Sequence, residues 1–186
     1  MPALALTDRD GLAGAIRFTK ACVGYGIAPI IGINLAIVLE GSSYSDISTR
    51  VTVLAHSNSG WRSLVRLLTG LQMNSADRTP VLTLELLEKF SNYTTNLHLL
   101  HGPESPVSQA LAVHRFDEAL ATFNQTRDFF ADHAMECVSH LVPGSGPRST
   151  AHAARSLIFA RDNDIDAIIT NYPDIAINIR KEFLRS

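Results

Sequence analysis

Runs of apolar residues alternate along this chain with segments in which apolar residues recur every three or four positions. The runs are rich in Ile, Val and Leu, and they predict six strands, at residues 4–6, 27–40, 51–57, 96–102, 135–142 and 166–170. The helical spacing predicts helices at residues 12–23, 61–71, 83–92, 105–133, where one or two helices fit, and 149–164. Strands separated by helices indicate an α/β fold, either a parallel sheet or a barrel of the βα type.

Polar residues collect where four of these strands end, in the segments LTDRDG, IIGINL, VSHLVPG and ITNYPD. The carboxyl ends of parallel strands meet at one edge of a sheet, where such side chains can form a site. Polar residues after strands also cap helices and hold turns, and Asp8 or Asp10 can cap the helix that follows the first strand. The pattern alone leaves both interpretations open.

Length and charge restrict the classes of protein that fit. We expect residues 1–186 to form one domain, and a net charge of −2 provides no strongly basic face for direct DNA binding. The apolar stretches at 27–39 and 165–170 are too short to span a membrane and no leader peptide is visible, so we expect a cytoplasmic protein. Cys22 and Cys137 lie far apart and outside any C-x-x-C motif, which predicts reduced thiols in the core.

Four motifs, in order, resemble the PHP (polymerase and histidinol phosphatase) domain of bacterial C-family DNA polymerases. They are ALALTDRDGLAGAIRF with GIAPIIGINLAI, then LAHSNSGWRSLVRLLTGLQM, CVSHLVPG and AIITNYPDIA, and together they are most similar to the error-prone branch. The resemblance, which runs from Leu4 to Ala176, implies a distorted (βα)7 barrel with up to three zinc or manganese ions that hydrolyse phosphoesters. The family's first strand, with its His-x-His motif, has no counterpart here, so the expected barrel is incomplete.

Most of the ligand positions that the resemblance implies are changed. Arg9 stands where the family has the histidine of T-D-H-D, and Asn34 stands where it has a glutamate. Ser139 replaces one of two histidines, and Tyr172 replaces the aspartate of T-N-D-x-H. An arginine offers a metal no lone pair, and an asparagine offers only a neutral carbonyl oxygen. Tyrosine has to ionise, from a pKa of about 10, before it is a good ligand.

Four ligand candidates remain, and they are Asp8, Asp10, His140 and Asp174, which stands at a histidine position of the family. They are too few for a site of two or three metals, so we expect no cofactor, and zinc or manganese only if this remnant is occupied. We predict instead that Arg9 replaces the cation by forming a salt bridge with Asp8, Asp10 or Asp174.

Two functions are compatible with this sequence. The first is a degenerate, non-catalytic PHP fragment of an error-prone DNA polymerase, an enzyme of DNA repair and replication, with the rest of the polymerase as its partner. The alternative is a residual metal-dependent phosphoesterase or 3′–5′ exonuclease. Nothing in these residues resembles the catalytic aspartates or the clamp-binding motif of a C-family polymerase, so we do not expect this fragment alone to act as a nucleotidyltransferase.

The missing first strand has a consequence for assembly. It should leave the backbone edges of the family's second and seventh strands unpaired. Such edges favour pairing with another chain, so we expect a homodimer through the open barrel edges, or a terminal segment folded into the gap.

Overall fold

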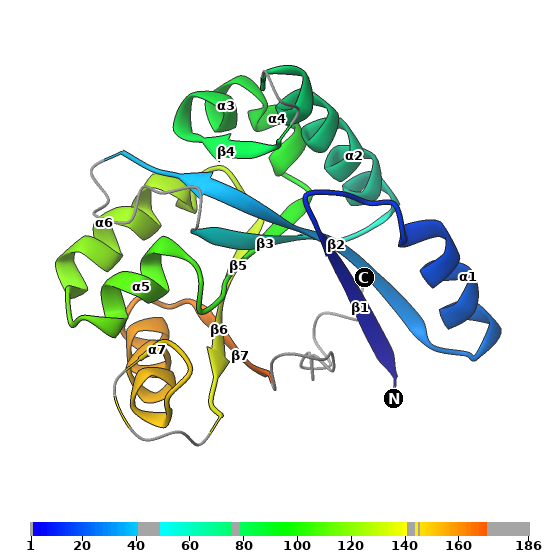
Figure 1. Cartoon of the computed structure of the whole chain (residues 1–186). Coiled ribbons are helices and arrows are strands. Elements are labelled where there is room, and N and C mark those ends of the chain that lie inside the picture. Colours follow the sequence, from blue (N-terminus) through cyan, green and yellow to red (C-terminus); the bar gives the residue numbers. More distant parts are fainter. Residues whose placement is uncertain (1, 41–48, 76–78, 141–143, 145, 171–186) are drawn as a thin grey trace.

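A computed structural model describes residues 2–40, 49–75, 79–140, 144 and 146–170 of the chain. The strands are β1 (Ala3–Arg9), β2 (Ala28–Val38), β3 (Arg50–Ala55), β4 (Val81–Thr83), β5 (Leu97–His101), β6 (Asp132–Val138) and β7 (Asp166–Thr170). The helices are α1 (Ala15–Gly24), α2 (Asn58–Met73), α3 (Leu84–Lys89), α4 (Ser91–Thr94), α5 (Pro106–Ala112), α6 (Phe116–Arg127) and α7 (Thr150–Asp162). All seven strands belong to one sheet that curls into half a barrel, with the helices on its outside (Figure 1).

The strand order in this sheet is β1-β2-β3-β5-β6-β7, and β4 pairs with the C-terminal end of β2. Helical crossovers join β1 to β2, β5 to β6 and β6 to β7, and each of these pairs is parallel. The prediction of a parallel sheet is wrong for β3, which is antiparallel to both β2 and β5. The connection from β2 to β3, residues 39–49, lies at the lower limit of the crossover of about a dozen residues or more that parallel strands need.

The predicted elements are present, with changes at their ends. β1 continues through Asp8 and Arg9, which the sequence had placed in a turn after the strand. The short strand β4 was missed, because its last residue was assigned to the following helix. Ser57 caps α2 and accepts a hydrogen bond from the backbone N–H of Gly60 at 3.2 Å.

The sheet has a helix-covered face and a concave face, and apolar residues line both. Ile33 and Leu35 of β2 belong to a large buried cluster with leucines of α2. On the concave face a smaller cluster comprises Leu54, Leu100, Ala134 and Ile168, with Ile30 packed against it. Cys22 and Cys137 are buried and free of disulfide bonds, as the sequence predicted. None of the helices in the described ranges is both long and apolar enough to cross a bilayer.

Candidate functional site

Asp8, the first candidate ligand, lies on the helix-covered side of β1, opposite Ile33 in the register. Its Oδ2 accepts a hydrogen bond from the backbone N–H of Gly14 at 3.2 Å, directly before the first residue of α1. A carboxylate at this position satisfies one of the N–H groups that a helix leaves unpaired at its start. The N-cap residue of α1 is Gly14, which has no side chain to cap the helix, so Asp8 caps α1 from outside the helix through this one N–H. Capping was one of the two interpretations left open for the acidic segment.

Asp10 follows β1 in a left-handed backbone conformation, with φ of 57°. Its N–H donates to the carbonyl oxygen of Asn34 at 3.0 Å, which turns the chain back over β2. The carboxylate, 28% exposed, forms an ion pair with Arg50 in which Nη2 lies 2.5 Å from Oδ1. Asp10 is thus held by both its main chain and its side chain.

Arg50 is the centre of this cluster, which comprises Asp10, Asn34, Arg50 and Thr52. Its side chain is 4% exposed, and its Nη2 also donates to the carbonyl oxygen of Asn34 at 2.7 Å. Its Nε donates to the side-chain oxygen of Asn34, and the side-chain nitrogen of Asn34 lies 3.4 Å from the Thr52 hydroxyl. A buried guanidinium is stable only where carboxylate and carbonyl acceptors match its donors in this way.

The predicted role of Arg9 needs correction. Arg9 does approach the Asp10 carboxylate, with Nε 3.7 Å from Oδ2, but its side chain is 70% exposed. Solvent screens such a contact, so it contributes little. The arginine that neutralises Asp10 inside the protein is Arg50, forty positions away in the chain, which the sequence analysis did not single out. The available signal was the alternation of Arg50 and Thr52 with Val51 and Val53, which puts the two polar residues on one face of the strand.

Glu136 is a second residue that the sequence analysis missed, and it is acidic. It lies two residues after Ala134 of the concave cluster in β6, so both side chains are on the concave face. Its carboxylate lies over Gly102, where an added Cβ would come within 2.5 Å of Oε2. Gly102 thus leaves the space that this carboxylate occupies, beyond the end of β5.

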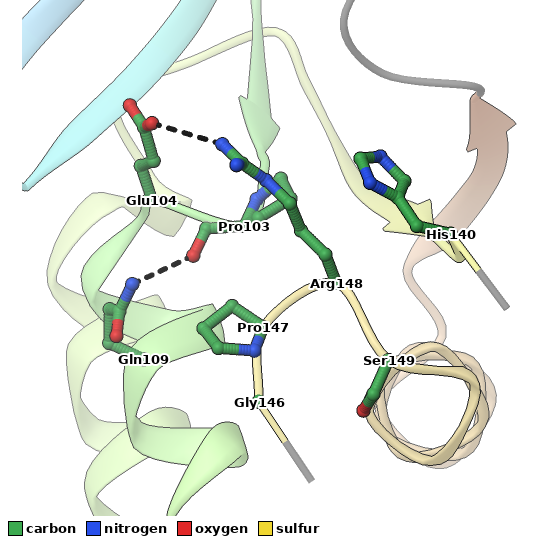
Figure 2. A pocket seen from close by; sticks show the side chains of 8 residues that line it. All are labelled: Pro103, Glu104, Gln109, His140, Gly146, Pro147, Arg148 and Ser149. Atoms are coloured by element: carbon green, nitrogen blue, oxygen red, sulfur yellow. Dashed lines mark hydrogen bonds and ion pairs between the residues drawn. The ribbon is translucent and has the colours of Figure 1, made fainter. Parts of the chain in front are cut away.

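His140 lies at the wall of a cavity of about 420 Å³ beyond the ends of β5 and β6 (Figure 2). The cavity is lined by Pro103, Glu104, Gln109, His140, Gly146, Pro147, Arg148 and Ser149. Arg148 forms an ion pair with Glu104, with Nη2 3.4 Å from Oε1, and its carbonyl oxygen accepts from the N–H of His140 at 3.0 Å. The exposed imidazole of His140 is the one candidate metal ligand among these lining residues.

The described residues do not bring the candidate ligands together. Asp8 faces the helices, Asp10 pairs with Arg50, and His140 lies in the wall of the cavity. Asp174, like Tyr172, lies outside the described residues. Within the described ranges, no three His, Cys, Asp or Glu side chains are placed so that they could hold a metal ion. The donor set described here therefore does not fit the metal cluster that the resemblance implies.

Two pairs of histidines lie on opposite faces of β5. His98 is close to His56, with ring centroids 4.7 Å apart, while His101 stacks on His133 on the other face. Their spacing of three residues along one strand places His98 and His101 on opposite faces. His133 lies in β6 and is half-buried, and His152 is buried next to α5, with its Nε2 2.9 Å from the carbonyl oxygen of Ser108.

The hydrogen bonds of the second pair define its protons. Nε2 of His133 faces the carbonyl oxygen of Arg127 at 3.1 Å, so Nε2 carries the proton and Nδ1 is an acceptor. Nε2 of His101 lies 3.2 Å from that Nδ1 and donates to it. Burial, with a smaller contribution from His133, lowers the pKa of His101 to about 3, and burial also lowers the pKa of His133. Both rings are therefore neutral bases at physiological pH.

Comparison with known proteins gives a consistent family. The model of the PHP domain family matches residues 1–140. The chain is 29% identical over 150 residues to "DNA polymerase III subunit alpha" of Thermus aquaticus, which covers 76% of this chain and 12% of that protein. It is 28% identical over 177 residues to the same subunit of Caulobacter vibrioides, covering 92% and 15%, and 38% identical over 81 residues to "Error-prone DNA polymerase" of Corynebacterium efficiens, covering 44% and 7%.

A solved structure supports the fold. A protein described as a metal-dependent phosphoesterase, from Bifidobacterium adolescentis, superposes with a TM-score of 0.52 at 12% identity, covering 96% of this chain and 81% of that one. At this identity the likeness concerns the fold alone. It confirms the expected barrel of PHP type, of which this chain forms a curled half.

Proposed function

The chain belongs to the PHP domain family, and from this premise we propose that it is a non-catalytic PHP domain of an error-prone DNA polymerase of the C family. Its relatives are large polymerase subunits, of which it spans 6–15% of the length. The rest of the polymerase is the partner in this proposal. The parent activity is DNA synthesis in repair and damage tolerance, in the cytoplasm, to which this domain would contribute as a packing module.

The ion pair between Arg50 and Asp10 is the observation that carries this proposal. Asp10 is in the motif where the family places metal ligands, yet its carboxylate already has a buried cation beside it. Two unit charges 4 Å apart interact by about 4 kcal/mol at an effective dielectric constant of 20, so a divalent ion beside Arg50 meets repulsion on the order of 8 kcal/mol. The carboxylate attraction that would offset this repulsion is shared with the guanidinium.

The capping role of Asp8 supports the same conclusion. Its Oδ2 is directed at the N-terminus of α1, so a metal ion would compete with the helix for this oxygen. Asn34, at the family's glutamate position, donates to Thr52 and accepts from Arg50. The residues that remain at the inherited site are thus committed to holding β1, β2 and β3 together.

A metal and activity assay tests the proposal. We expect the purified protein, incubated with zinc or manganese and then desalted, to retain no stoichiometric metal by mass spectrometry. We also expect no hydrolysis of a phosphate monoester or of single-stranded DNA in added manganese. Stoichiometric metal, with turnover that is lost in Asp8→Asn, would overturn the proposal. Asp8→Asn is chosen because an amide oxygen can still cap α1, and Asp132→Asn serves as a control at an exposed carboxylate.

The alternative function is a residual phosphoesterase or 3′–5′ exonuclease. The observation that favours it is the cavity beside His140 and Arg148, since an imidazole and a guanidinium are suited to a phosphate group (Figure 2). Arg148 is already paired with Glu104 there, which reduces the positive charge available to a substrate. Turnover lost in His140→Gln but retained in Asp8→Asn would establish this second function in place of the first.

We also propose a homodimer through the open edges of the half-barrel. β1 and β7 are the two ends of the strand order in the described sheet. A strand at such an edge presents backbone N–H and C=O groups to any extended segment that reaches it. Pairing of one chain's edge with that of a second copy would satisfy these groups.

A further inference from the structure

We infer that Asp10 and Asn34 form a receptor for a guanidinium group, of which Arg50 is the resident ligand, and that this receptor selects the planar cation over a metal ion. The inference rests on the proposed function, because it names what the former metal-binding motif recognises. The two are nevertheless separable by experiment, since a receptor can exist whether or not metal binds elsewhere in the chain.

The acceptors are arranged for a planar fork. Nη2 of Arg50 donates to Asp10 Oδ1 at 2.5 Å and to the carbonyl oxygen of Asn34 at 2.7 Å. Nε donates to the side-chain oxygen of Asn34. Three acceptors on two residues thus meet two nitrogens of one rigid group. An ammonium group has its donors around a single point, so it matches such a fork poorly.

The Asn34 part of the receptor is held by contacts other than those to the guanidinium. The Asn34 carbonyl oxygen also accepts from the N–H of Asp10 at 3.0 Å, and the Asn34 side chain is oriented by Thr52 at 3.4 Å. Asn34 lies inside β2, paired to Arg9 on one side and Thr52 on the other. The two acceptors of Asn34 and the main chain of Asp10 should therefore keep their positions when the side chain of Arg50 is removed.

Metal ions are poorly served by the same acceptors. Among them only Asp10 offers a charged oxygen, whereas zinc sites take four ligands from thiolate, imidazole and carboxylate groups. Within the described ranges, Asp10 belongs to no group of three His, Cys, Asp or Glu side chains that could hold a metal ion. The chemistry of the set thus favours a cation that binds by hydrogen bonds.

Chemical rescue tests the receptor. Arg50→Ala should lower the melting temperature by roughly 6 to 15 °C, because it leaves a partly buried carboxylate without its cation. Guanidinium or ethylguanidinium chloride at about 20 mM, far below the molar range in which guanidinium unfolds proteins, should restore part of this loss in a saturable manner. Equal concentrations of ammonium or sodium chloride should not. Manganese and zinc should restore nothing.

The controls make each outcome decisive. Arg9→Ala removes an exposed arginine from the same carboxylate and should show neither the loss nor the rescue. Arg50→Lys keeps the charge and the long side chain, so it should fold even if Arg50→Ala does not, yet melt several degrees below the parent. A parent-like Arg50→Lys, a missing rescue of folded Arg50→Ala, or equal rescue by metal would overturn the receptor. Metal bound stoichiometrically by the parent protein would instead overturn the proposed function and leave the receptor standing.

Discussion

His101 lies in the core and is 2% exposed, and its Nδ1 has no hydrogen-bond partner among the described residues. This nitrogen is the acceptor end of a series of hydrogen bonds that runs from His101 through His133 to the Arg127 carbonyl oxygen. Protonation at Nδ1 would place a charge between the sheet and Phe123 of α6, whose ring lies 5.5 Å from that of His101. Burial opposes that charge, and it is the main reason that the pKa of His101 falls to about 3.

This lowered pKa predicts acid sensitivity. The folded state binds a proton at His101 less well than the unfolded chain does, where the pKa is about 6.5. The stability that neutral His101 contributes is therefore complete above pH 6.5 and is lost as the pH falls toward 3. Between pH 7.5 and 5.5 His101 should reduce the free energy of unfolding by about 1.4 kcal/mol. Urea unfolding at the two pH values should show this loss in the parent and a loss smaller by that amount in His101→Gln, which keeps a donor for His133. His114→Gln, at an exposed site, should behave as the parent does, and an unchanged loss in His101→Gln would contradict the assignment.

At the site, the sequence predicted the type of interaction but not the residue that makes it. It indicated an arginine in place of a cation beside Asp10, and chose Arg9 because Arg9 stands among the acidic residues at a ligand position of the family. Arg9 does approach the Asp10 carboxylate, but its side chain is 70% exposed, so solvent screens the contact. Arg50 reaches Asp10 only because β3 runs antiparallel beside β2, which brings it opposite Ala36, close to Asn34. That pairing depends on the whole sheet and on a connection whose path no local pattern specifies.

At the scale of elements, periodicity identified the buried runs, while strand direction and short strands depended on the rest of the fold. β2 has the continuous apolar sequence of a covered strand and was predicted within a few residues. β4 has only three residues, held by pairing to β2, which is too short to show an alternation of its own. For α1 the apolar spacing predicted the helix, and Asp8, one of the two acidic residues offered as its cap, accepts from the N–H of Gly14 six residues later.

The start of α1 leads to a prediction about packing. Gly14 has an ordinary helical backbone, with φ of −78°, so space alone requires glycine there. A Cβ would come within 2.8 Å of Asp8 Oδ2 and 3.1 Å of a methyl group of Leu6. Gly14→Ala should push the capping carboxylate aside and lower the free energy of unfolding by about 1 to 2 kcal/mol, measured by urea unfolding.

A glycine at the other end of α1 provides the control. Gly24, the last residue of α1, has no atom within 4 Å of an added Cβ. Gly24→Ala should leave stability unchanged or raise it by up to about 1 kcal/mol, because alanine restricts the unfolded chain. Equal effects of the two substitutions would show that the Asp8 carboxylate does not depend on the absence of a Cβ at position 14.

At the scale of the whole molecule, a half-barrel differs from a closed one in having edges. β1 and β7 lie on either side of the concave face (Figure 1). Natural edge strands are protected by lysines, prolines or bulges, and β7 has the sequence DAIIT, with one charged residue at its start. Ile169 is 68% exposed on this strand. An apolar, nearly uncharged edge favours association with another strand, which is the physical basis for the proposed homodimer.

Light scattering after size exclusion tests this assembly. The parent should elute as a dimer at micromolar concentrations, and Ile169→Lys should convert it to a monomer, because a lysine at an edge requires hydration that pairing would remove. Val23→Lys, at another exposed apolar residue, on α1, should leave the dimer intact. A monomeric parent would remove the dimer from the proposal, and a dimer that survives Ile169→Lys would place the contact away from β7. Neither result would affect the Arg50–Asp10 ion pair, since that pair is made within one chain.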